Sequence, residues 1–155
     1  MAKSQGAKAN LTGNRLEKFI EQNLIECGFA KIMDKKTLAN AMHNFNKPSF
    51  ASQVNIGQTI YGTDLICDFL LYHPQKWPDG LVIEAKWQQV GGTVDEKYPY
   101  FVLNIWSSEY ETVFVLDGGG YRPGAEKWVR AMQKDNLLHV FNMTEFQKWV
   151  NQGNV

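Results

Sequence analysis

The sequence predicts an α/β domain in which helices flank a mixed central β-sheet. The first observation is an apolar stripe with helical spacing in residues 13–27. The second is a pair of apolar strand segments, 64–73 and 81–86, joined by a turn. Third, strands and helices alternate from residue 93 towards the C-terminus. An alternating order of this kind is typical of a sheet covered by helices.

Composition indicates one globular domain. A length of 155 residues with 44% hydrophobic content is enough for a core of its own. The 16 basic and 16 acidic side chains balance, so a surface for nucleic acid would have to be local. Cys27 and Cys67 lie in apolar surroundings, and we expect buried, reduced thiols in a cytoplasmic, intracellular protein. We find no signal peptide and no apolar run of membrane-spanning length, and we expect no membrane contact.

Residues 1–12 are small and polar, with Lys3 and Lys8, and we expect a flexible basic N-terminal arm. Such an arm is either an ordinary disordered terminus or a contact for phosphate groups. Residues 13–155 then form a single domain. Its first helix is expected over residues 13–27, before the stop at Gly28. The apolar positions of that helix are Leu16, Phe19, Ile20, Leu24 and Cys27.

Residues 30–50 place basic side chains among aromatic ones, and two interpretations stay open. Such a segment can hold a nucleic-acid backbone or stack on a base, and it can equally be a solvated face over two core phenylalanines. Lys35 and Lys36 are the candidates for phosphate contact. Residues 37–45 predict a short helix, which Pro48 would end.

Three strands are expected next. Residues 54–61 alternate as a strand in which Gly57 would form a bulge. The turn at residues 62–63 leads into the strand 64–73, and the two strands form a hairpin. Residues 73–80 connect this hairpin to the strand 81–86.

The second half of the chain predicts alternating helices and strands. Thr93 and Glu96 fit a capping box, so a helix should follow them. Pro99 falls inside that helix and predicts either a kink or a later start. Residues 112–117 form a short apolar run that is typical of a buried strand. The elements expected after the following loop are a helix at 125–133, a strand at 137–141 and a helix at 144–150.

Three glycines at residues 118–120 follow the predicted strand and precede a helix. A glycine-rich turn at the start of a helix can cradle a phosphate. No P-loop sequence is present, because no Gly-Lys-Ser/Thr follows. Arg122, just beyond the glycines, is a candidate clamp for a phosphate backbone.

Three charged residues interrupt the two apolar strands. Asp68 lies inside the first strand, and Glu84 and Lys86 lie at the end of the second. A charge beside apolar core residues is costly unless it is paired or binds a metal. Strand side chains alternate between faces, so Glu84 and Lys86 point the same way, and Asp68 can reach that face if the strands pair. We therefore expect the three groups to converge at the sheet edge and to hold Mg²⁺. A structural ion pair is the alternative.

Asp68, followed after fifteen residues by Glu84-Ala85-Lys86, resembles the D…(D/E)xK signature of the PD-(D/E)XK nuclease superfamily. The upstream helix with Glu17 behind a glycine, the glutamines after Lys86, and the VDEK segment add to the resemblance, which covers about residues 13–120. One departure is that Cys67, rather than a proline, precedes Asp68.

The resemblance implies a restriction-endonuclease-like α-β-β-β-α-β core and hydrolysis of phosphodiester bonds in DNA with Mg²⁺, for which Mn²⁺ can substitute. Asp68, Glu84 and the backbone carbonyl of Ala85 would then bind the metal. Lys86 would position or activate the attacking water, with Glu17 supporting the metal or its water. Gln88 would contact the scissile phosphate. No organic cofactor is expected.

The predicted enzyme is a metal-dependent endonuclease of restriction, homing or junction/repair type. Cleavage of both strands would need two copies of a small domain with one active site, so we expect a homodimer. The main alternative is a catalytically inactive nucleic-acid-binding domain of the same fold. A further alternative is an unrelated enzyme in which the charges form a structural ion pair.

Overall fold

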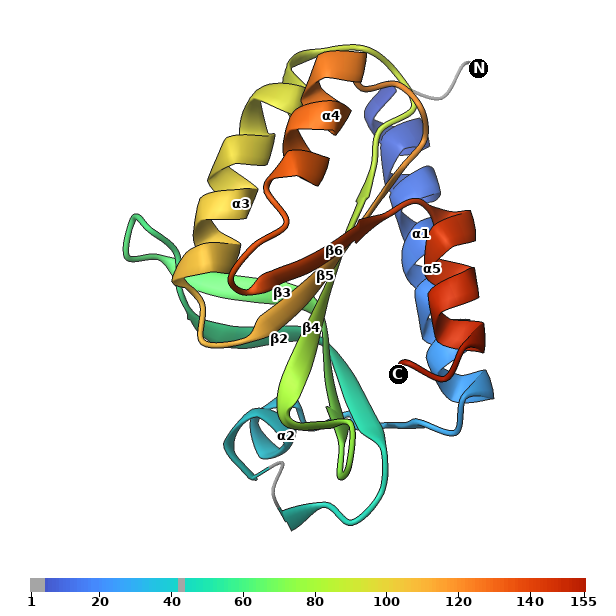
Figure 1. Ribbon diagram of the computed structural model, residues 1–155, viewed down its shortest axis with the longest axis vertical. Helices are drawn as coiled ribbons and strands as arrows, with labels where there is room; N and C mark the ends of the chain where they lie inside the picture. The colour runs from blue at the N-terminus through green and yellow to red at the C-terminus, as the bar shows by residue number, and fades with distance from the viewer. Residues whose placement is uncertain (1–4, 42–43) are drawn as a thin grey trace.

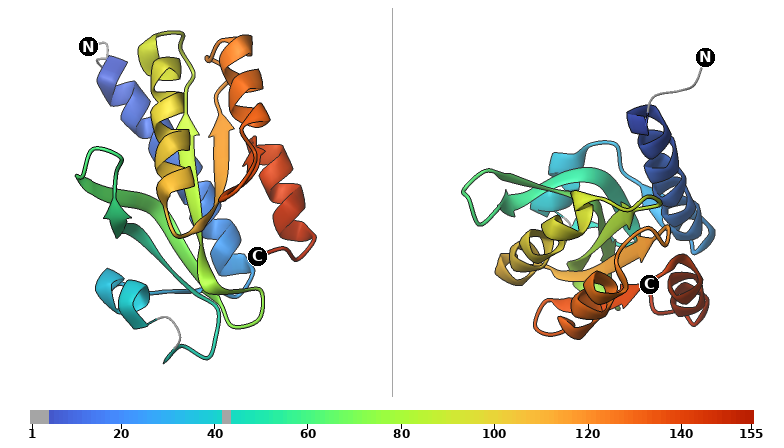
Figure 2. Two further views of the ribbon diagram at one scale, coloured as in Figure 1. Left: turned by 60° about the vertical axis from the view of Figure 1, so that its left-hand side comes forward. Right: turned by 90° about the horizontal axis from the view of Figure 1, so that it is seen from above.

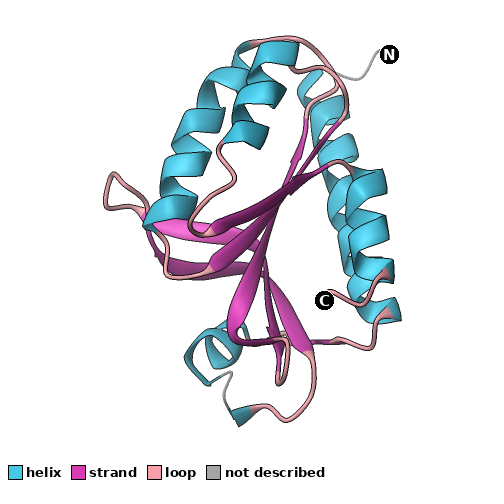
Figure 3. Ribbon diagram, in the orientation of Figure 1, coloured by secondary structure: helices cyan, strands magenta, loops and turns pink. Residues whose placement is uncertain are grey.

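The computed structural model describes residues 5–41 and 44–155. Its sheet has six strands in the order β1-β2-β3-β4-β5-β6, with helices on both faces (Figure 1, Figure 3). The β2–β3 and β3–β4 pairs are antiparallel, whereas the β1–β2, β4–β5 and β5–β6 pairs are parallel. The predicted α/β class with a mixed central sheet is therefore confirmed. The strands are β1 (Ala30–Lys31), β2 (Ser49–Gln58), β3 (Asp64–His73), β4 (Trp77–Trp87), β5 (Glu111–Asp117) and β6 (Leu137–Phe141).

Two helix layers enclose the sheet (Figure 2). On one face, α1 (Gln5–Glu26) and α5 (Met143–Asn151) bury Ile20 and Phe146 in a core cluster with Ile83 of β4. On the other face, α3 (Tyr98–Ser107) and α4 (Pro123–Ala131) pack over β5 and β6. The alternation of side chains along β5 supplies both clusters, with Val113 and Val115 in the first and Phe114 and Leu116 in the second.

The helix α1 begins at Gln5, so it includes residues that the sequence assigned to the flexible arm. The predicted start of this helix at residue 13 is therefore wrong, and residues 1–4 of the expected arm lie outside the described residues. The short helix α2 (Lys35–Ala41) begins two residues before the predicted position. The Asp34 carboxylate explains that start, because its Oδ1 accepts from the backbone N–H groups of Lys36 (3.1 Å) and Thr37 (3.3 Å).

The predicted capping box at Thr93 is wrong. Thr93 to Lys97 form a 3-10 helix with no side-chain cap, and α3 starts after it with Pro99 in its first turn. Proline is well tolerated there because its missing N–H has no partner within the helix. The structure instead places a capping box at Asn142 and Glu145, where α5 begins.

The two cysteines differ in exposure. Cys67 is fully buried and Cys27 is exposed, so the prediction of a buried thiol holds for Cys67 alone. Burial raises the pKa of the Cys67 thiol, which keeps the group protonated.

Among the described residues, no helix is both long enough and apolar enough to cross a membrane.

Candidate active site

The site forms where β3 and β4 separate in the middle of the sheet. Their antiparallel pairing runs from His73–Trp77 to Phe69–Ile83. One further step in that register would place Asp68 across from Glu84. From this point β4 continues beside β5, with Ala85 against Val115 and Lys86 against Leu116. The opening between two central strands, rather than a lateral sheet edge, therefore presents the charged residues.

On the β4 side, where the β-ladder has ended, the Asp68 carboxylate takes the place of a backbone partner, and on the β2 side it accepts a further hydrogen bond within a regular ladder. Its Oδ2 accepts a hydrogen bond from the backbone N–H of Ala85 at 2.8 Å. Its Oδ1 accepts from Nε2 of Gln53 on β2 at 3.3 Å. In an extended strand the N–H and C=O of one residue point to the same side, so the Ala85 carbonyl lies on the side of its N–H, towards β3. The Asp68 side chain is thus fixed on the side of the carbonyl that the family resemblance implied as a metal ligand.

Lys86 joins the two carboxylates. Its Nζ lies 3.6 Å from Oδ2 of Asp68 and 3.7 Å from Oε2 of Glu84. The same ammonium group lies over the ring of Phe101 in α3, 5.1 Å from the ring centroid. The Lys86 side chain is 30% exposed, against 13% for Asp68 and 16% for Glu84. The expected convergence of the three charges is found, and Lys86 is the member most open to solvent.

The ionised forms of Glu84 and Glu17 are disfavoured at this site, so the pKa of each carboxyl group is raised. Burial raises the pKa of Glu84 to about 8, and the negative charge of Asp68 adds to the increase while Lys86 opposes it. Burial also raises the pKa of Glu17, again with a contribution from Asp68 and opposition from Lys86. Glu17 on α1 is therefore within electrostatic reach of both residues. Leu16 and Ile20, buried on either side of Glu17, anchor that part of the helix on the sheet.

The donor set suits a hard divalent cation. Asp68, Glu84 and the Ala85 carbonyl offer oxygen ligands, which Mg²⁺ and Mn²⁺ prefer. A bound cation would offset the cost of burying the Glu84 charge beside Asp68, the two causes that raise the pKa of Glu84. Within residues 5–41 and 44–155, no group of three or more His, Cys, Asp or Glu side chains is close enough to form a cage made by side chains alone. Mg²⁺ typically needs only one or two carboxylates, because water and phosphate oxygens complete its coordination.

The structure does not offer Gln88 to a phosphate. Gln88 is 4% exposed, its Nε2 donates to Oδ1 of Asp95 at 2.6 Å, and its Oε1 accepts from the Tyr98 hydroxyl. The hydrogen bond from Gln88, followed by one from the Arg122 backbone, lowers the pKa of Asp95. The predicted phosphate contact would require these buried bonds to break. Gln88 instead ties the end of β4 to the start of α3.

Two of the three glycines after β5, Gly118 and Gly120, allow close packing against the end of β4. The N–H of Gly120 donates to the carbonyl of Gln88 at 2.7 Å, and the N–H of Gln88 donates to the carbonyl of Asp117 at 2.9 Å. A Cβ added at Gly118 or Gly120 would overlap the backbone of residues 88–90. The glycines therefore hold the segment that follows Lys86 against the end of β5.

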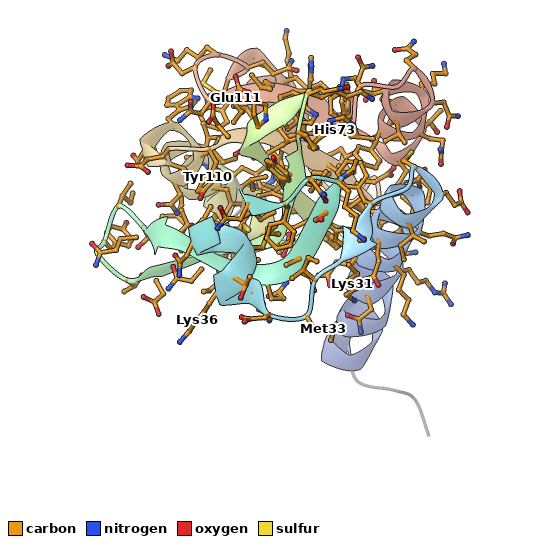
Figure 4. All side chains as sticks on the ribbon, turned by 90° about the horizontal axis from the view of Figure 1, so that it is seen from below. Lys31, Met33, Lys36, His73, Tyr110 and Glu111 are labelled. Carbon is orange, nitrogen blue, oxygen red and sulfur yellow. The ribbon has the colours of Figure 1, made fainter. Side chains whose placement is uncertain are left out.

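The predicted phosphate-binding residues lie on two different parts of the surface. Arg122 is 66% exposed, and its Nε lies 3.8 Å from Oδ2 of the buried Asp95, at the end of the sheet where β4 finishes. Lys35 and Lys36 are exposed on α2, and Figure 4 shows Lys36 pointing outward on the underside of the molecule. The backbone N–H of Arg122 donates to Asp95, the same carboxylate that Gln88 contacts. The helix α2, by contrast, packs against β2.

Gln53 is a site residue that the sequence did not reveal. Its side chain donates a hydrogen bond to Asp68, and its backbone has a positive φ of 55°. Residues other than Gly, Asn and Asp rarely adopt this backbone conformation. Residues 52 and 54 pair with β3 in a regular way on either side of it. A strained backbone next to a candidate metal ligand is common at functional sites. A glutamine in a strand gives no sign in the sequence of a positive φ or of a bond to Asp68.

A family model described as the PD-(D/E)XK nuclease superfamily domain matches residues 8–154. This match spans nearly the whole chain, including the segment beyond Gly120 that the sequence motifs did not reach. No curated protein and no solved structure matches the chain.

Proposed function

Because the chain belongs to the PD-(D/E)XK nuclease superfamily, we propose that it is a Mg²⁺-dependent endonuclease that hydrolyses phosphodiester bonds in DNA. Mn²⁺ is expected to substitute for Mg²⁺ because both ions prefer oxygen ligands. The observation that carries this proposal is the convergence of three charged groups. The Lys86 ammonium group lies 3.6 Å from the Asp68 carboxylate and 3.7 Å from the Glu84 carboxylate. These are the three residues of the D…ExK motif.

Asp68, Glu84 and the Ala85 carbonyl would hold the metal ion, with Glu17 supporting it from α1. When bound, a divalent ion polarises the phosphodiester and stabilises the leaving oxygen. The Ala85 N–H holds one oxygen of Asp68 at 2.8 Å, so the carboxylate is oriented before any ligand arrives. Orientation of this kind reduces the reorganisation that the reaction would otherwise require.

Lys86 is placed to act on the attacking water and on the phosphate. Its ammonium group is the most solvent-exposed of the three charges, and it is held between two carboxylates and the Phe101 ring. From this position it would orient the nucleophilic water and neutralise the charge that develops on the phosphate. Glu17, whose pKa is raised by burial, is a second group that can hold a proton near the water.

The proposed active form on duplex DNA is a homodimer. One site cuts one strand in each encounter, and a twofold pair of sites matches the twofold symmetry of a duplex. Sequence-specific, junction-specific and repair-type cleavage all agree with this arrangement.

A cleavage panel tests the proposed activity. Wild-type protein would be incubated with supercoiled plasmid, single-stranded DNA, a four-way junction and RNA, each with Mg²⁺, Mn²⁺ or a chelator. We expect metal-dependent cutting of DNA, its loss in Asp68→Ala, and its retention in Asp79→Ala, an exposed aspartate on the same sheet. Failure of the wild type to cut any of the substrates with either metal would refute the proposal.

A further inference from the structure

A pocket of about 260 Å³ opens beside the candidate active site. Its lining residues come mainly from α3 and from the hairpin that joins β2 to β3. This hairpin projects beside α3 (Figure 1, Figure 2). Glu84 and Lys86 line the pocket together with the apolar side chains of Ile66, Phe101 and Ile105. The pocket is therefore continuous with the site that would bind the scissile phosphate.

The chemistry of the pocket does not suit a phosphate. Its acidic and basic lining groups are Asp64, Glu84 and Lys86, and Glu84 keeps its proton up to about pH 8 because burial raises its pKa. Asp64 and Lys86 then balance, so the pocket has no excess of positive charge to attract an anion. Most of the remaining wall is apolar or aromatic, with Phe101 and Phe114 among the rings. A flat, uncharged ring with polar edges fits these walls better than a charged group does.

Polar groups at the wall match the edge of a base. Asn104 is buried, and its Oδ1 accepts from the backbone N–H of Ile60 at 2.8 Å, which holds the hairpin to α3. Asn104 also lines the pocket, so its amide is a polar group of the pocket wall. Asp64, the first residue of β3, adds a carboxylate to the lining. Amide donors and carboxylate acceptors are the groups with which proteins bind base edges.

Aromatic rings extend from the pocket to the surface. Tyr100, which lines the pocket, stacks on Tyr61 of the hairpin with ring centroids 5.3 Å apart and an interplanar angle of 23°. Tyr61 is 77% exposed. Exposed rings next to a backbone-binding site are typical of proteins that stack on unpaired bases.

We propose that this pocket binds one unpaired nucleobase of the strand whose phosphate lies at Lys86. The inference rests on the proposed function and narrows its substrate to DNA with an unpaired nucleotide near the cleavage point, as in single strands, junctions or distorted duplexes. A base inside an intact duplex is stacked and cannot enter a pocket of this kind without being extruded.

Binding of two charge-matched oligomers to metal-free wild-type protein tests the pocket. Oligothymidylate and an abasic oligomer of equal length carry the same phosphates and differ only in their bases. We expect oligothymidylate to bind at least about 5-fold more tightly, the factor that one stacked base provides. Equal affinities, or binding of neither oligomer, overturn the inference.

A matched pair of variants locates the effect. Ile66→Trp places a large ring in the pocket, whereas Ile60→Trp makes the same change at a hairpin residue that does not line it; the two isoleucines are 45% and 40% exposed. We expect Ile66→Trp to lose the preference for oligothymidylate and Ile60→Trp to keep it. An unchanged preference in Ile66→Trp overturns the inference, and the wild-type comparison stands even if a variant does not fold.

Cleavage assays separate this inference from the proposed function. If Mg²⁺-dependent cutting is found but abasic and base-bearing strands are cut with equal kcat/KM, the pocket inference is wrong and the nuclease proposal stands. If nothing is cut but the preference for base-bearing oligomers is found in wild type and lost in Ile66→Trp, the nuclease proposal is wrong and base binding stands.

Discussion

At the scale of single residues, charge in an apolar setting was the informative feature of the sequence. Asp68, Glu84 and Lys86 stand out among Ile, Leu, Val and Phe, and the structure brings their charged groups together. The local sequence did not reveal the structural roles of Gln88 and Gln53. The burial of Gln88 depends on Asp95 and Tyr98. The left-handed backbone of Gln53 lies between two residues, Ser52 and Val54, that pair with β3. Neither partner set can be inferred from the local sequence, because both come from tertiary contacts.

Glu84 makes the stability of the metal-free protein depend on pH. Its pKa is about 8 in the folded protein, against 4.5 for an ordinary glutamate, so the folded state binds its proton more tightly than the unfolded state does. Between these two values the free energy of unfolding falls as the pH rises, and above about pH 8 the loss is complete. The protonated Glu84 side chain therefore makes its full contribution to stability only below about pH 4.5, the ordinary pKa of a glutamate.

Glu84→Gln should therefore stabilise the metal-free protein at high pH. At about pH 9 we expect a gain in the free energy of unfolding on the order of a few kcal/mol, because the neutral amide avoids the buried charge. At about pH 5 the two proteins should be similar. Urea unfolding in a chelator at both pH values measures this, and an equal effect at both would show that Glu84 is not the source.

Substitutions of Gln53 separate backbone strain from its bond to Asp68. Gln53→Gly should be more stable than Gln53→Ala by about 1 kcal/mol, since only glycine adopts the positive φ without a steric cost. Both variants lose the amide that donates to Asp68, so both should cut DNA more slowly than the wild type. Denaturant unfolding and initial cleavage rates test the two statements. An alanine variant as stable as the glycine variant would contradict the left-handed assignment.

At the scale of helices and strands, patterns predicted the existence of elements better than their ends. The helical stripe of α1 and the apolar runs of β3 and β5 were found where the pattern indicated them. The strand β4 extends beyond the predicted 81–86 at both ends. The strand β2 was predicted at 54–61 and is found at Ser49–Gln58, because residues 49–52 pair with β3. The two-residue strand β1 exists only through its pairing with β2 and leaves no pattern.

The contact between the glycine loop and the end of β4 should be essential for the position of Lys86. Gly120→Ala would force a Cβ into the backbone of Gln89 and Val90, and we expect a loss of about 1–3 kcal/mol in stability together with reduced cleavage. Gly124→Ala in α4 is the control. Its added Cβ meets open space, so it should be neutral or slightly stabilising. Thermal unfolding of both variants measures the difference, and equal stabilities would rule out the close packing.

At the scale of the whole molecule, the mixed sheet explains how one site gathers groups from distant parts of the sequence. The opening between β3 and β4 lies centrally in the strand order, with α1 over one face and α3 over the other. Glu17 and Phe101 therefore approach the same pair of strands from opposite layers. The sequence order of helices and strands was sufficient to predict the layers. The place where two paired strands separate was not predictable, because Asp68 substitutes for backbone partners only in the folded sheet.

Dimerisation should be visible in the products of plasmid cleavage. A single domain carries one site, so at low protein concentration we expect nicked circles to accumulate before linear DNA. Formation of linear DNA should rise more steeply than in proportion to protein concentration, whereas nicking should rise in proportion. Gel analysis over a concentration series measures both, and parallel dependence of the two products would argue against a dimer.

The most direct test of the central claim is the rate of plasmid nicking by Lys86→Ala protein, at a Mg²⁺ concentration that saturates both it and the wild type. Removal of an ammonium group beside Asp68 and Glu84 should leave Mg²⁺ binding no weaker, because a competing positive charge is lost. We predict that nicking nevertheless falls by about 10²–10⁴-fold, the range for loss of a group that positions or activates a reacting water. Nicking at the wild-type rate would contradict the assignment of this site as the nuclease centre.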